Sequence, residues 1–131
     1  MTIDVNWHDD AKRILVLSFH PDTGWEEFKQ VLTASFDSIR ALKHSVVMIH
    51  NWEATKPNLS DSSAAELLAV LRNTPINLVL TISVGISGLA ISLGSLVVRL
   101  ARLPVDVTPT MDDALKLAHD KLGIQFANAE H

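Results

Sequence analysis

Apolar and polar residues alternate at the start of the chain. In "IDVNW", Ile3, Val5 and Trp7 are separated by polar residues, which is typical of a half-buried strand. The next segment, "RILVLSF", is apolar at successive positions and so predicts an interior strand. Because only the short turn "HDDAK" joins them, the two segments should form an antiparallel hairpin.

The segment "TGWEEFKQVLTASFDSIRAL" changes to helical spacing. Thr23, with Glu26 three residues later, fits a capping box at the start of this helix. Its apolar residues recur every three or four positions, which predicts one broad apolar stripe: Trp25, Phe28, Val31, Leu32, Phe36, Ile39 and Leu42.

A buried strand is predicted at Val46–Ile49, followed by the aperiodic loop "NWEATKPNLSDS". Ser63 and Glu66 form a second capping-box pattern, which opens a helix through Leu71. Pro75 disfavours helical backbone at the residue before it, so this helix should end there.

No charged residue occurs between Arg72 and Arg99. By length this run could cross a bilayer, which needs about 20 apolar residues. However, "INLVLTISV" is rich in β-branched residues, "GISG" interrupts it, and "LAISLGSLVVRLARL" returns to helical spacing. A strand, a turn and a helix fit the flanking α/β pattern better than a transmembrane span, because a bilayer does not tolerate an open strand edge.

The C-terminal part predicts a short strand around Val105 and Val107 and a helix that starts at Thr110 and ends at Gly123. The predicted order is therefore ββαβαβαβα. This order indicates an α/β fold with a mostly parallel five-stranded sheet and an antiparallel N-terminal edge strand. We expect one domain over residues 1–123 and a flexible tail over residues 124–131.

Composition and short motifs argue against several classes of function. The net charge is −4 and the basic residues are scattered, which argues against a nucleic-acid surface. There is no cysteine, which excludes disulfides, thiol catalysis and cysteine metal sites. The N-terminus lacks the basic and apolar regions of a signal peptide, so we expect a cytoplasmic protein. The histidines show no metal-binding spacing, and no Gly-x-Ser-x-Gly elbow occurs. We therefore expect no metal, no cofactor and no enzymatic activity.

The motif "DSSAAELLAVLR", at 61–72, resembles the motif that opens a helix in the STAS superfamily of anti-sigma-factor antagonist (SpoIIAA-like) domains. Asp61, Ser62 and Ser63 match its Asp-Ser-Ser-Gly, whereas Ala64 replaces the glycine. The order of elements from Ile3 to about Leu122 is similar to STAS domains, and also to relatives grouped with CRAL-TRIO lipid-transfer domains. This resemblance implies a STAS-like fold and phosphorylation of a serine, Ser63 or Ser62, by a partner kinase. Helix capping is the alternative role of these serines.

Two segments are candidate ligand sites. His50 and Trp52 follow the carboxyl end of a predicted strand, where open α/β sheets bind ligands. Gly85, Ser87 and Gly88 of "GISG" precede a predicted helix and could cradle an anion. The structural alternatives are a strand-end histidine, a tryptophan that holds its own loop, and a tight turn.

The predicted helix 89–103 is apolar almost all round, which requires something to cover it. The residues that would be covered are Leu89, Leu93, Leu96, Val97 and Leu100. We interpret the protein as a noncatalytic regulatory or protein-interaction module of STAS type that forms a homodimer through this helix. The alternative is a protein that binds a small apolar ligand or a lipid in a groove beside the same helix.

Overall fold

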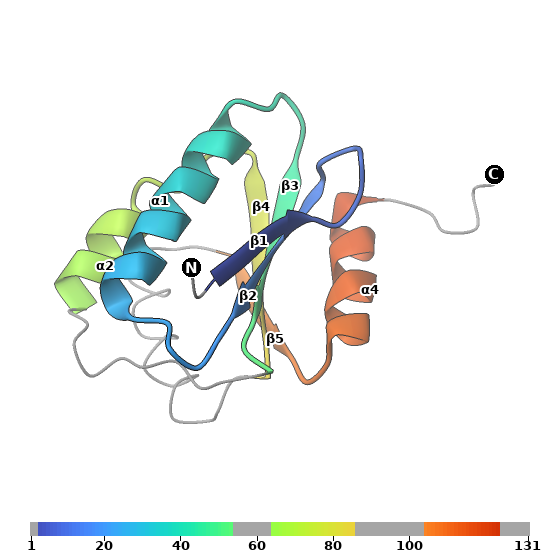
Figure 1. Cartoon of the computed structure of the whole chain (residues 1–131). Coiled ribbons are helices and arrows are strands. Elements are labelled where there is room, and N and C mark those ends of the chain that lie inside the picture. The colour runs from blue at the N-terminus through green and yellow to red at the C-terminus, as the bar shows by residue number, and fades with distance from the viewer. Residues whose placement is uncertain (1–2, 54–63, 86–103, 124–131) are drawn as a thin grey trace.

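The computed structural model describes residues 3–53, 64–85 and 104–123. It contains one five-stranded sheet whose strands lie side by side in chain order (Figure 1). The strands are β1 (Ile3–Trp7), β2 (Ile14–Phe19), β3 (Val46–Asn51), β4 (Leu78–Val84) and β5 (Val105–Thr108). β1 pairs antiparallel with β2, and all other neighbours are parallel. The predicted α/β class and the antiparallel edge strand are confirmed.

Helices cover both faces of the sheet. The helices α1 (Trp25–Arg40) and α2 (Ala64–Leu71) lie on one face, and α4 (Met111–Leu122) lies on the other (Figure 1). The strands are added in a single direction, so right-handed crossovers place α1 and α2 on the same side. The predicted helix 89–103 and the predicted tail 124–131 lie outside the described residues.

The sheet separates two apolar cores. The core under α1 and α2 contains Ile3, Leu15, Leu17, Phe19, Leu32, Phe36, Ile39, Val46, Met48, Trp52 and Leu78. The core under α4 contains Ile14, Val47, Ile49, Leu80, Ile82, Val84, Ala114 and Ala118. β2 and β3 supply alternate residues to both cores, which explains why their sequences are apolar at nearly every position.

A bulge at the start of β4 changes which face its side chains meet. Val46 pairs with Leu78, but the next residue, Val47, pairs with Leu80, so Val79 is the extra residue. Leu78 therefore belongs to the α1–α2 core, whereas Leu80 and later alternate residues belong to the α4 core. The regular apolar alternation of this strand gives no sign of the bulge.

The helix termini agree with prediction in part. Thr110 caps α4 as expected, because its side chain accepts a hydrogen bond from the Asp113 N–H, and Gly123 ends the helix in the left-handed conformation. The capping box predicted at Thr23 is wrong. α1 begins one residue later, after Gly24, and Thr23 Oγ1 instead accepts a hydrogen bond from the His20 N–H. Among the described residues, no helix combines the length and apolar character needed to span a bilayer.

Candidate functional site

Aromatic side chains fill the carboxyl edge of β2 and β3. Phe19 and Trp52 are stacked, with ring centroids 3.7 Å apart and an interplanar angle of 5°. Phe28 of α1 approaches His50 and Trp52 edge-on, at centroid distances of 5.9 and 6.0 Å. We call Phe19, Phe28, His50 and Trp52 the aromatic cluster. It occupies the position at which open α/β sheets commonly bind ligands.

His50 is held within this cluster in a neutral form. The residue is 9% exposed, and its Nε2 lies 3.0 Å from the Met48 sulfur. Burial lowers the pKa of its imidazole to about 4, because the apolar surroundings penalise the charged ring. At neutral pH the ring therefore acts as an aromatic packing group without charge.

Trp52 is 8% exposed and lies in the core under α1 and α2. Its backbone N–H donates to the carbonyl of Val84, at 2.8 Å, so the backbone after β3 is joined to the end of β4. One face of its indole is stacked on Phe19. The residue thus holds the segment after β3 against the domain.

Gly85 directly follows β4 and has a φ of +74°, and its N–H donates to the carbonyl of Thr108. A Cβ at this position would lie 3.1 Å from the Cα of Glu53. The glycine is therefore required by backbone conformation and by close packing. Ser87 and Gly88, the other candidates in "GISG", lie outside the described residues.

The structure does not describe the candidate serines or the predicted self-association residues. Ser62 and Ser63 lie outside the described residues, immediately before α2 in the sequence. Leu89, Leu93, Leu96, Val97 and Leu100 also lie outside them. Their roles in phosphorylation and self-association stay predictions.

An ionic contact joins the N-terminal parts of α1 and α2. Lys29 lies 2.6 Å from the carboxylate of Glu66 and 2.9 Å from that of Glu26. The Trp25 indole N–H also donates to Glu66, at 3.4 Å. Hydrogen bonding to Lys29 lowers the pKa of Glu66, and hydrogen bonding to Glu66 raises the pKa of Lys29. These contacts link the N-terminal parts of α1 and α2.

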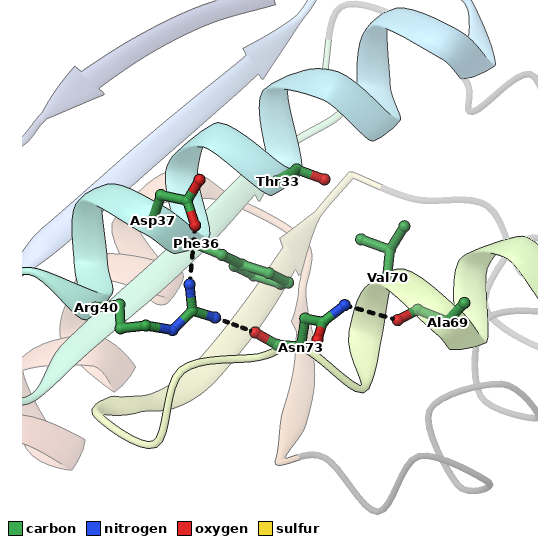
Figure 2. A pocket seen from close by; sticks show the side chains of 7 residues that line it. All are labelled: Thr33, Phe36, Asp37, Arg40, Ala69, Val70 and Asn73. Atoms are coloured by element: carbon green, nitrogen blue, oxygen red, sulfur yellow. Dashed lines mark hydrogen bonds and ion pairs between the residues drawn. The ribbon is translucent and has the colours of Figure 1, made fainter.

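Toward the C-terminal parts of the two helices lies an open groove with a volume of about 550 Å³. Figure 2 shows the side chains that line it. We call it the α1–α2 groove. It is lined by Thr33, Phe36, Asp37, Arg40, Ala69, Val70 and Asn73. Arg40 pairs with Asp37 at 2.9 Å and also donates to the carbonyl of Asn73, across the end of the groove (Figure 2). The groove therefore has apolar side chains beside a charged rim.

A second groove, with a volume of about 260 Å³, lies between β1 and α1. We call it the edge groove. It is lined by Val5, Trp7, Leu15, Val31, Ala34, Ser35 and Ser38. Sequence reasoning identified neither groove. Each depends on the distance between α1 and a neighbouring element, α2 or β1. Hydrophobic periodicity does not predict that distance.

Comparisons of the chain with protein-family models, with curated proteins and with solved structures found no match. The STAS resemblance therefore rests on the motif at 61–72 and on the order of elements. Among the described residues, no group of three or more histidine, aspartate or glutamate side chains could hold a metal ion.

Proposed function

We propose that this protein is a noncatalytic protein-interaction module of STAS type that acts in the cytoplasm. The observation that carries the proposal is the α1–α2 groove, which is open to solvent and lined by both apolar and charged side chains. By contrast, the protein's own aromatic cluster occupies the carboxyl edge of β2 and β3.

The chemistry of the α1–α2 groove suits a side chain from another protein. Phe36 and Val70 offer apolar contact, which drives most association. Arg40 uses one N–H toward Asp37 and another toward Asn73, while a guanidinium carries five N–H donors. Arg40 can therefore also donate to a carbonyl or carboxylate of the partner without losing its present contacts.

The proposal includes regulation by a kinase. Ser62 and Ser63 directly precede α2, which forms one wall of the groove. In the STAS domains that the motif resembles, a serine at this place is phosphorylated. The groove is lined by the C-terminal part of α2, at Ala69 and Val70, and by Asn73 just after it, so a phosphate before the N-terminus would act on a partner that also contacts the start of the helix. Self-association through Leu89–Leu100 is a further part of the proposal.

Affinity capture with a matched pair of variants tests the proposed interaction. Thr33 lines the groove and is exposed, so Thr33→Arg should obstruct it. Gln30→Arg adds the same charge at an exposed position of the same helix, outside the groove lining. In lysate of the native host, we expect the unaltered chain and Gln30→Arg to retain the same partner and Thr33→Arg to lose it. Equal recovery by all three would reject the groove as the interaction site.

A second candidate function, binding of a small apolar ligand or lipid, is supported by one feature of the sheet. Val105 and Val107 of β5 pair with Thr81 and Ser83 of β4 and are 37% and 38% exposed. An apolar molecule could cover these valines. Native mass spectrometry of freshly purified protein should then show a bound adduct that is reduced in Val107→Lys, and a chain free of adducts from several hosts would exclude this function.

A further inference from the structure

The outer edge of β1 has unpaired backbone groups. The His8 N–H donates to the carbonyl of Ile14, and the β1–β2 register continues this pairing without a shift. Hydrogen-bonded pairs alternate in an antiparallel ladder, so Asp4 and Asn6 direct their backbone groups toward β2. The N–H and C=O groups of Ile3, Val5 and Trp7 therefore point away from the sheet. No strand among the described residues pairs with this edge.

The same residues supply the apolar side of this edge. Val5 and Trp7 line the edge groove, together with Val31, Ala34 and Ser38 of α1. Val5 is 41% exposed, so its side chain is accessible from this edge. Backbone groups that can bind a strand thus lie next to a groove that can receive its side chains. This combination is typical of surfaces that bind an added strand.

We propose that a second copy of this chain pairs antiparallel with β1, so that the two sheets become continuous across a two-fold axis at Val5. In this arrangement Val5 lies opposite the partner's Val5, and Ile3 lies opposite the partner's Trp7. All the outward backbone groups of β1 are then paired. The inference rests on the proposed interaction function and assigns its self-association to the edge of β1 in place of Leu89–Leu100, so that one two-fold contact gives a closed dimer.

Charge and backbone pairing favour this register over the registers centred on Asp4 and on Asn6. Asp4 lies opposite the partner's Asn6, so no two charges of the same sign face each other. A register centred on Asp4 would place two carboxylates directly opposite, which is destabilising. A register centred on Asn6 would leave the backbone groups of Ile3 without partners. The sequence of β1, "IDVNW", is therefore self-complementary about Val5.

The test is light scattering of the whole chain and of variants that carry a charged residue in place of Val5. The unaltered protein should have twice the mass of one chain. In Val5→Lys, two lysines would face each other across the axis, which should raise the dimer Kd by at least about tenfold. Val107→Lys makes the same change at a similarly exposed valine, 38% exposed, on the opposite edge strand, and should remain dimeric.

Mixing Val5→Lys with Val5→Glu provides the positive control, because opposite charges then meet across the axis. Each variant alone should be monomeric, and the mixture should recover the dimer mass, which also shows that both variants are folded. An unaltered protein that is monomeric at all accessible concentrations overturns the inference. A dimer that survives Val5→Lys also overturns it while leaving association through Leu89–Leu100, and hence the proposed function, intact.

Discussion

At the scale of single residues, His50 makes the stability of the fold sensitive to acid. Its ring is packed against Phe19 and Phe28, with centroids 5.7 and 5.9 Å away, and lies beside the Met48 sulfur. Protonation would place a positive charge in this apolar cluster. The unfolded chain pays no such penalty, because water solvates its imidazolium ions.

The sign of the pH dependence follows from these two states. The pKa of His50 is about 4 in the folded protein and about 6.5 in the unfolded chain, so between these values the unfolded chain binds more protons. The contribution to stability is complete above pH 6.5 and is lost as the pH falls toward 4. We expect a loss of about 3 kcal/mol from this group. Urea unfolding from pH 7 to pH 4 should show a shallower pH slope in His50→Leu than in the unaltered protein. Equal slopes in the two proteins would contradict the assignment.

Two glycines offer a matched comparison of backbone constraint. Gly85 has a φ of +74°, and a Cβ there would lie only 3.1 Å from the Cα of Glu53, whereas Gly24 has a φ of −96° and no atom within 4 Å of the Cβ position. We expect Gly85→Ala to lower the free energy of unfolding by about 1–3 kcal/mol. Gly24→Ala should change it by less than about 1 kcal/mol. Thermal or urea unfolding of the two variants measures this difference, and similar values would show that Gly85 is not constrained as described.

At the scale of elements, one side chain connects the end of α1 to the start of β4. The Asn77 amide nitrogen lies 2.7, 3.2 and 3.1 Å from the carbonyl oxygens of Ile39, Leu42 and His44. It thereby satisfies carbonyls at a helix end that has no further turn to pair with. The position of α1 on the sheet depends on this contact as well as on apolar packing.

Replacing Asn77 tests the connection. Asn77→Ala removes the donor and should lower the free energy of unfolding by about 1–3 kcal/mol. Asn77→Asp keeps the size of the side chain but directs oxygen atoms at carbonyl oxygens, so it should be at least as destabilising at neutral pH. Urea midpoints of both variants provide the measurement. If the aspartate variant were as stable as the unaltered protein, the amide would not be acting as a donor.

At the scale of the whole molecule, the two cores share one sheet and should unfold together. Trp7, Trp25 and Trp52 all lie on the α1 side, where Trp7 packs against the core and Trp52 belongs to it. Ile82 is fully buried in the other core, under α4. Domains of this length usually unfold in one step, because neither face of the sheet is stable without the other.

A cavity under α4 should therefore be detected by tryptophans on the opposite face. Ile82→Ala should lower the free energy of unfolding by about 2–5 kcal/mol. We expect the same shift in the urea midpoint from tryptophan fluorescence and from far-ultraviolet circular dichroism. If fluorescence kept its original midpoint while circular dichroism shifted, the two cores would be independent folding units.

Hydrophobic patterning predicted the order and type of the described elements. It also predicted the antiparallel β1, because short connections and alternation are local features. The capping residue of α4 was predicted correctly from Thr110 and Asp113. The start of α1 was not, since Thr23 and Gly24 both fit a cap and only the turn at His20 decides between them.

The sequence by itself determined that this chain forms an alternating α/β domain. The reason is that periodicities of two and of about 3.6 residues can be recognised in the local order of apolar side chains. Only the tertiary structure decided which face each strand presents, because a single extra residue at Val79 reverses the alternation relative to β3. It also decided that His50 and Trp52 pack into the aromatic cluster, and that open space lies beside α1. These features depend on distances between elements that are remote in sequence, and no local pattern specifies those distances.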